Sequence, residues 1–159
     1  MSKIWYACYG SNILYERFCY YIRGGIYAPT GKTYPGCSDT TLPTEDGPIV
    51  IPYEMYFGNK SHSWDDCGVA FLDTSKPSAV LGRAYLISDE QFNEVHLQEG
   101  SSSNWYNYEL DLGIYRDYPI KTFTNSTRRP ENRPSDVYLQ VIMQGMQELI
   151  GTQIIIPNK

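Results

Sequence analysis

The chain has 159 residues, of which 42% are hydrophobic and 14% aromatic, and this is enough apolar material for one sizeable core. We therefore expect residues 1–159 to form a single domain. The formal net charge is −5, and the 13 Lys and Arg residues are scattered except for Arg128 and Arg129. This pattern argues against a nucleic-acid surface and against a membrane partner.

Cysteine usage indicates the compartment. The four cysteines are Cys8, Cys19, Cys37 and Cys67. They form no Cys-x-x-Cys pair, and the two histidines, His62 and His96, are not spaced with them as zinc ligands. We expect buried thiols in a reducing setting, no metal and no disulfide framework. With no signal peptide and no long apolar span in the sequence, the expected location is the cytoplasm.

The first third of the chain predicts a strand, a helix and a long loop. Residues 4–9 are apolar or aromatic throughout, which is typical of a strand buried on both faces. Residues 13–23 have helical spacing, with Leu14, Phe18 and Tyr21 on one face and two glycines at the end. Residues 26–48 are rich in Gly, Pro, Thr and Ser, and a loop of this length often borders a functional site.

The remaining elements are short strands with two helices among them. Strands are predicted for residues 48–57, 67–73, 80–87, 105–112 and 119–123, and helices for residues 89–98 and 134–150. The second and third of these strands are expected to be joined across residues 75–78. Because the order has no regular strand–helix–strand rhythm, an α+β fold is favoured.

The junction between the first strand and the first helix is the most suggestive stretch, with the sequence Tyr9-Gly10-Ser11-Asn12. A turn of this kind leaves backbone N–H groups that point toward whatever lies in front of the helix. Gly10 permits close approach of a ligand or a positive φ, and Ser11 and Asn12 are each suited to cap the helix or to contact a polar ligand. A capped helix without any ligand is the simpler interpretation of these four residues alone.

One carboxylate is predicted to face inward. Phe92, Val95, His96 and Glu99 share a face of the helix over residues 89–98, and the two apolar residues mark that face as the inner one. Partial burial and the negative end of the helix dipole both disfavour an ionised Glu99, which suits a general base. The alternatives are a Glu99 side chain that turns to solvent or that pairs with an arginine such as Arg83. His96 is interpreted as a packing residue rather than a metal ligand.

These motifs, in this order, resemble the γ-glutamylcyclotransferase-like family. The resemblance rests on Tyr9-Gly10-Ser11-Asn12, Gln98-Glu99-Gly100 and Tyr106, and on segments 57–64, 67–70, 81–85 and 134–138, so it covers most of the chain. Three departures are visible: His96 where many relatives carry Asp, Ile13 for the usual Leu, and a longer loop over residues 27–48.

The resemblance implies an α+β fold with a small closed mixed β-barrel and flanking helices. It also implies release of 5-oxoproline from a γ-glutamyl amine or peptide without a cofactor, with Glu99 as general base and then acid. The implied substrate-binding residues are Tyr9, Gly10, Ser11, Asn12, Tyr106 and Tyr138. The expected partner is a small-molecule substrate, and the sequence leaves open the leaving group and the oligomeric state.

The hypothesis leaves open a γ-glutamyl-tagged amine, such as an antibiotic precursor or a crosslinked lysine, as the substrate. Two functions of other kinds compete with it. The first is a non-catalytic module on the same fold that binds a small amino-acid-like ligand, with Glu99 recognising its ammonium group. The second is a thiol enzyme that uses Cys8 or Cys67, and it is disfavoured because neither cysteine is placed beside a histidine in the predicted elements.

Overall fold

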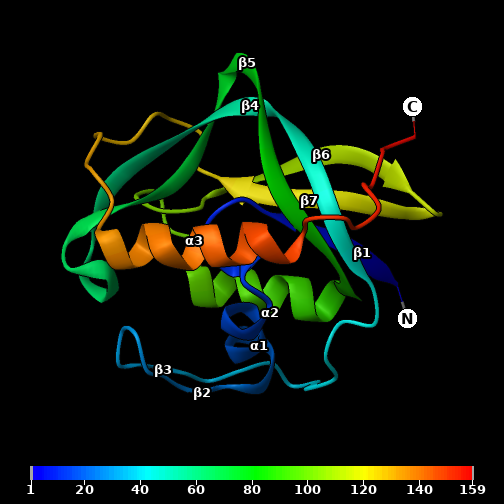
Figure 1. The fold of residues 1–159 in the computed structure, drawn as a ribbon, viewed down its shortest axis with the longest axis horizontal. Coiled ribbons are helices and arrows are strands. Elements are labelled where there is room, and N and C mark those ends of the chain that lie inside the picture. Colours follow the sequence, from blue (N-terminus) through cyan, green and yellow to red (C-terminus); the bar gives the residue numbers. More distant parts are fainter. Residues whose placement is uncertain (1, 159) are drawn as a thin grey trace.

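A computed structural model describes residues 2–158 (Figure 1). The strands are β1 (Lys3–Cys8), β2 (Gly25–Tyr27), β3 (Lys32–Tyr34), β4 (Asp46–Ser61), β5 (Cys67–Ser88), β6 (Tyr108–Tyr115) and β7 (Tyr118–Thr124). The α-helices are α1 (Tyr15–Arg23), α2 (Asp89–Glu99) and α3 (Asp136–Glu148), and two short 3-10 helices are η1 (Ser11–Ile13) and η2 (His62–Trp64). The predicted α+β class is confirmed.

The main sheet has the strand order β4-β5-β1-β7-β6, with β1 at its centre. Strand β1 pairs antiparallel with β5 and parallel with β7, so the sheet is mixed as predicted. Because successive side chains of a strand point to opposite faces, Tyr6 and Cys8 join the core under the helices while Trp5 and Ala7 join a second core on the other face. This two-sided burial explains the unbroken apolar sequence of β1.

The prediction of a closed barrel is wrong. Within residues 2–158 the backbone hydrogen bonds between strands leave the sheet open, with β4 and β6 as its edges. The C-terminal tail spans these two edges instead. The N–H of Ile155 donates to the carbonyl of Pro48 in β4 at 2.8 Å, and the N–H of Asn158 donates to the carbonyl of Ile114 in β6 at 2.6 Å. These two contacts come from a segment without strand periodicity, which is why the sequence did not reveal them.

The two predicted strands over residues 67–73 and 80–87 form one continuous strand, β5, which pairs with β4 as a long bent hairpin (Figure 1). The register shifts between Ile51 and Glu54, so residues 74–76 on β5 have no partner at the bend. Such bulges sharpen local bending. The bend brings the far half of β5 back onto β7, where the Thr124 hydroxyl accepts from Leu72 N–H at 2.9 Å and donates to the Leu72 carbonyl at 3.0 Å.

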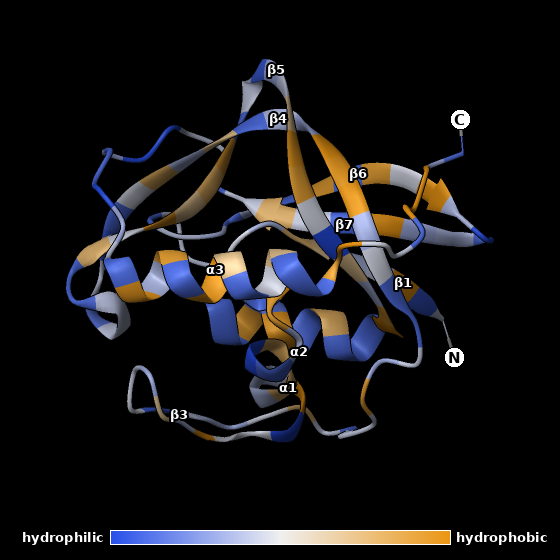
Figure 2. Cartoon of the chain, in the orientation of Figure 1, coloured by the Kyte–Doolittle hydropathy of each residue, from blue (hydrophilic) through white to orange (hydrophobic). Residues whose placement is uncertain are grey.

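The three α-helices cover one face of the sheet, and the short β2–β3 hairpin lies beyond α1 (Figure 1). This hairpin falls in the predicted loop over residues 26–48, so that part of the loop prediction is wrong. Along helix α3 hydrophobic and hydrophilic residues alternate, as Figure 2 shows, and its buried residues Val141 and Ile142 face the core. The helices therefore close the core into which the strand-to-helix turn at residues 9–12 projects.

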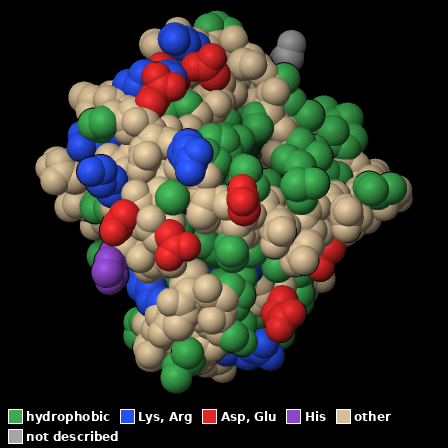
Figure 3. Space-filling view, turned by 60° about the vertical axis from the view of Figure 1, so that its left-hand side comes forward, with side chains coloured by type: hydrophobic (Ala, Val, Ile, Leu, Met, Phe, Trp, Pro, Cys, Tyr) green, Lys and Arg blue, Asp and Glu red, His purple; other side chains and the backbone are tan. Residues whose placement is uncertain are grey.

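The surface carries charges of both signs, which intermingle on the face shown in Figure 3. Several of them pair, as in the cluster where Arg128 contacts Glu54 at 3.1 Å and Asp73 at 2.7 Å. None of the helices in the described part of the chain combines the length and apolar character needed to cross a membrane.

Candidate active site

The turn after β1 is a 3-10 turn followed by a break, and not the direct start of a helix. The helix predicted from Ile13 begins at Tyr15, because Leu14 is extended with φ −72° and ψ 118°. Gly10 has φ −113°, so its role is close approach and not a positive φ. A Cβ at this position would lie 2.7 Å from the Tyr138 hydroxyl and 3.2 Å from Ala70 Cβ. Only glycine leaves the backbone room to pass there.

Ser11 and Asn12 do not cap a helix, since no side-chain capping bond is formed at η1 or α1. Asn12 instead donates through Nδ2 to Glu99 Oε1 at 2.7 Å and to the Tyr6 hydroxyl at 3.1 Å. Its Oδ1 is buried and accepts no hydrogen bond from residues 2–158. A buried acceptor of this kind costs free energy unless a ligand or solvent satisfies it.

Glu99 stands at the last position of α2. Ser88 begins this helix with a capping box, in which it accepts from Gln91 N–H while the Gln91 side chain accepts from Ser88 N–H. Gly100 ends it with φ +102°. The Glu99 side chain is half-buried and turns inward to Asn12. The alternative of pairing with Arg83 is wrong, because Arg83 contacts Asp46 at 2.8 Å and Glu148 at 2.6 Å.

A cavity of about 40 Å³, here called the inner cavity, lies between the turn and Glu99. Its lining includes every residue that the sequence nominated as a site residue, from four separate elements or turns: Tyr9, Gly10, Ser11, Asn12, Glu99, Tyr106 and Tyr138. An adjoining pocket of about 70 Å³ shares Ser11, Glu99, Tyr106 and Tyr138 with it. Glu99 therefore borders two neighbouring hollows, one on the side of the turn and one on the side of α1.

The three predicted tyrosines differ in what their hydroxyl groups do. Tyr9 donates to the Phe123 carbonyl at 2.8 Å, and Tyr106 donates to the Ala70 carbonyl at 2.9 Å. Tyr138 accepts from Ala70 N–H at 2.9 Å, which leaves its own proton for a further acceptor. The hydroxyl protons of Tyr9 and Tyr106 are therefore committed to backbone carbonyls, whereas that of Tyr138 is not.

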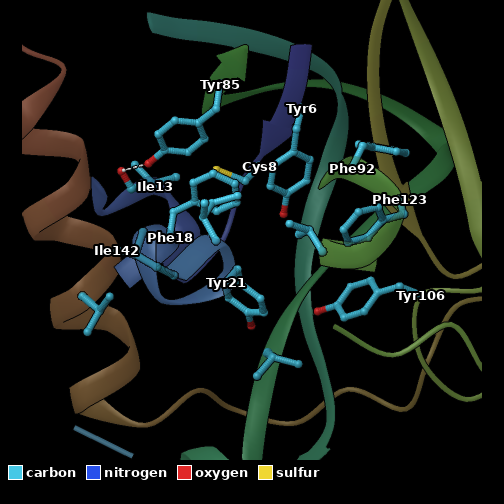
Figure 4. Close-up of a cluster of buried hydrophobic side chains, with 14 of the residues drawn as sticks. Tyr6, Cys8, Ile13, Phe18, Tyr21, Tyr85, Phe92, Tyr106, Phe123 and Ile142 are labelled. Carbon is cyan, nitrogen blue, oxygen red and sulfur yellow. Dashed lines mark hydrogen bonds between the residues drawn. The ribbon is translucent and has the colours of Figure 1, made fainter. Parts of the chain in front are cut away.

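Residues that the sequence did not nominate complete the site. Tyr6 stacks on Phe123 with ring centroids 5.3 Å apart, and Phe123 lies 5.8 Å from Tyr106 (Figure 4). Burial, followed by the nearby Glu99 charge, raises the pKa of Tyr6 well above its usual value. Arg17 and Tyr21 of α1 line the adjoining pocket. Tyr21 has helical core spacing in the sequence, which hid its place in the pocket.

Cys8 also borders the inner cavity, which returns the thiol hypothesis to consideration. Burial raises the pKa of its thiol far above the usual value, and the group donates to the Arg83 carbonyl at 3.3 Å. A protonated thiol is a poor nucleophile. Cys67, the other candidate, is free and only half-buried, and it is not part of the lining of either hollow.

His96 packs flat on Phe123, with ring centroids 4.3 Å apart and an interplanar angle of 3°, and its Nε2 contacts the Tyr106 carbonyl. This agrees with the interpretation of His96 as a packing residue, and it ties Tyr106 to α2. Among residues 2–158, no three His, Cys, Asp or Glu side chains are grouped as metal ligands.

Comparison with known proteins gives a relative by sequence and several solved structures with a similar fold. The chain is 28% identical to histone deacetylase 5 of Arabidopsis thaliana in an alignment 187 positions long, gaps included, that covers 91% of this chain. It spans only 28% of the length of that plant protein, whose name therefore describes a much longer molecule. No family model matches the sequence.

The solved structures extend over the whole fold. A gamma-glutamyl cyclotransferase superposes with a TM-score of 0.68 at 20% identity, covering 99% of this chain and 90% of that one. An uncharacterized protein from Homo sapiens superposes with a TM-score of 0.66 at 21% identity, covering 100% of this chain and 91% of that one. The predicted resemblance is confirmed at the level of the fold: the chain has the fold of gamma-glutamyl cyclotransferase.

Proposed function

We propose that the chain is a γ-glutamylcyclotransferase-type enzyme that releases 5-oxoproline and a free amine or amino acid from a γ-glutamyl compound. The observation that carries the proposal is the Glu99 carboxylate, fixed by Asn12 at 2.7 Å beside a cavity that the Gly10 backbone also borders. The shared fold with a gamma-glutamyl cyclotransferase supports the same assignment.

In the proposed reaction, the first step is loss of a proton from the substrate's α-ammonium group. Glu99 accepts this proton, and the unpartnered Asn12 Oδ1 offers a second acceptor to the same group. The free amine then attacks the γ-carbonyl carbon of the same molecule, and a five-membered ring forms. Holding the glutamyl chain curled supplies the proximity that this ring closure needs.

The second step breaks the γ-amide bond. The tetrahedral carbon returns to a carbonyl as the C–N bond to the leaving amine breaks, and Glu99 gives its proton to the departing nitrogen. The ring nitrogen loses its surplus proton to the Glu99 carboxylate, which passes it to the released amine, so that the products are the neutral lactam and an ammonium ion. Backbone N–H groups of the turn over residues 9–12 hold the α-carboxylate or the developing oxyanion, and Tyr138 has a hydroxyl proton for the same purpose. The reaction is an internal acyl transfer, so the proposal includes no cofactor and no protein nucleophile.

Four free cysteines, three of them buried, suit a reducing compartment, and we propose the cytoplasm as the location. The substrate is a small molecule, in keeping with the size of the two hollows.

The test is to incubate the protein with a broad panel of γ-glutamyl amino acids, peptides and amines and to quantify 5-oxoproline. Catalytic release from at least one compound, at a rate proportional to protein concentration, is expected. The competing function is a binding module on the same fold, which would bind a panel member with no 5-oxoproline formed. That outcome overturns the enzymatic proposal.

A further inference from the structure

The adjoining pocket contains a buried guanidinium group whose hydrogen-bonding capacity is mostly unused. Arg17 of α1 is 2% exposed and borders this pocket together with Glu99. One of its three nitrogens, Nη2, donates to the Tyr21 hydroxyl at 3.1 Å. The other two, Nε and Nη1, are buried and have no hydrogen-bond acceptor among residues 2–158.

Aromatic rings surround this group. The guanidinium carbon of Arg17 lies 4.6 to 4.8 Å from the ring centroids of Tyr21, Tyr27 and Tyr34. Rings of this kind stabilise a buried cation through their π faces, but they accept no conventional hydrogen bond from its N–H groups. The desolvation of the charge is therefore only partly offset by the protein itself.

The group stays charged in this setting. Burial lowers the pKa of Arg17, but the interactions with Tyr21, Tyr34 and Glu99 outweigh burial and leave the pKa above its usual value. Lys32 lies on the rim of the same pocket with its Nζ 5.0 Å from the Tyr34 ring centroid. Two cations against the single carboxylate of Glu99 make the pocket suited to an anion.

We infer that the adjoining pocket is a carboxylate subsite in which Arg17 binds the carboxyl group of the leaving amine. The inference rests on the proposed function and narrows the substrate from γ-glutamyl amines in general to γ-glutamyl α-amino acids or peptides. The inner cavity takes the glutamyl part, and the scissile nitrogen lies at Glu99, which both hollows share. In an α-amino acid the carboxylate stands two bonds from that nitrogen, on the side of Arg17.

The subsite also explains why the unsatisfied N–H groups are tolerated. A carboxylate that enters the pocket accepts charge-assisted hydrogen bonds from buried N–H groups, and such bonds are strong in buried surroundings. A leaving amine without a carboxylate leaves the same N–H groups without partners. This difference makes Arg17 a specificity-determining residue.

The test compares two substrates that differ only in this carboxylate, γ-glutamyl-alanine and γ-glutamyl-ethylamine. In the wild type, we expect kcat/KM to be roughly 10- to 100-fold higher for γ-glutamyl-alanine than for γ-glutamyl-ethylamine, mainly through a lower KM. A hydrogen bond to a charged group typically changes binding by about this factor. In Arg17→Gln the ratio should fall to near one, while Arg17→Lys should keep part of it. Arg23→Gln, an exposed position on the same helix, is the matched control and should keep the wild-type ratio.

Equal kcat/KM for the two substrates in the wild type, or a wild-type ratio in a folded Arg17→Gln, would overturn the inference. If Arg17→Gln does not fold, the wild-type ratio and that of Arg17→Lys decide. If neither substrate yields 5-oxoproline, affinities for the two compounds are measured by calorimetry. Binding of the carboxylate compound at least tenfold tighter would then support the subsite although the pair is not turned over, and equal or absent binding would overturn the subsite.

Discussion

Two buried arginines near the same turn have opposite surroundings. Arg83 of β5 is 7% exposed, and it contacts Asp46, Glu148 and the Ile13 carbonyl at 2.6 to 2.9 Å. We call these four residues the closed cluster. Every group there has a partner, and the cluster ties β4, β5, the turn before α1 and the end of α3 together.

Arg17 is buried even more completely and has one hydrogen-bond partner among the residues described. We call the three residues Arg17, Glu99 and Asn12 the open pocket. Asn12 resembles Arg17 in that its Oδ1 also has no partner among the residues described. Burial alone therefore does not distinguish a structural charge from one that awaits a ligand, whereas the count of satisfied atoms does. Changes in the open pocket should alter activity and spare stability, and changes in the closed cluster should do the reverse.

The largest expected effect is that of Glu99→Gln in the open pocket. The amide has the same shape but accepts no proton, so 5-oxoproline release should fall by about a hundredfold or more. The melting temperature should stay close to that of the wild type. Glu90→Gln, an exposed position on the same helix, is the control with unchanged activity. Near-wild-type turnover by Glu99→Gln would remove the proposed base.

The next effect is on stability, from Arg83→Met in the closed cluster. Two carboxylates lose their partner, and because the side chains of Asp46 and Glu148 are 27% and 39% exposed, solvent compensates in part. We expect the free energy of unfolding to fall by about 1–3 kcal/mol, less than for a fully buried pair. Denaturant titration measures the free energy of unfolding. Arg116→Met, which breaks the exposed ion pair with Glu45, is the control and should change this free energy little. An unchanged midpoint would show that the closed cluster is not structural.

A Gly10→Ala substitution probes the wall of the inner cavity. Its Cβ would press on the Tyr138 hydroxyl, so both stability, by about 1–3 kcal/mol, and activity should fall. Adding Tyr138→Phe removes the clashing oxygen and should restore part of the stability. If Gly10→Ala has the same free energy of unfolding and the same turnover as the wild type, the space beside Gly10 is wider than the distances to Tyr138 and Ala70 indicate.

The smallest effect is expected from Tyr106→Phe. This change removes one buried hydrogen bond to the Ala70 carbonyl and should cost about 1 kcal/mol of stability. Turnover should stay within about tenfold of the wild type, since the hydroxyl is committed to the backbone. A hundredfold loss of activity with unchanged stability would instead assign the hydroxyl to the substrate.

The sequence predicted the class of the fold and seven of the residues that line the inner cavity, but it missed Tyr6 and Phe123 there and the α1 residues that line the adjoining pocket. Apolar spacing was enough to identify β1 and the helices, and the inward face of α2 was enough to nominate Glu99. The bend of the β4–β5 hairpin depends on register shifts, and the alternation of residues along the sequence does not predict where such shifts occur. Arg17 was missed because its burial depends on rings from β2 and β3, in a segment interpreted as a loop.

A signal for Arg17 was nevertheless present. It stands four residues before Tyr21 on the apolar side of α1, where a charged residue has no reason to lie unless it is paired or bound. The Asn12 side chain shows the converse case, in which a residue suited to capping is used to hold a carboxylate. Local conformational preference indicates which roles a side chain is suited to, and tertiary packing decides which atoms it contacts.

The most direct measurement is a crystal structure of the protein soaked with 5-oxoproline, the proposed product. The account predicts that the ring occupies the inner cavity, with its nitrogen near the Glu99 carboxylate and an oxygen at the backbone of the turn over residues 9–12. A ligand bound at saturating concentration elsewhere, with the inner cavity filled only by solvent and Glu99 making no contact to it, would contradict the account.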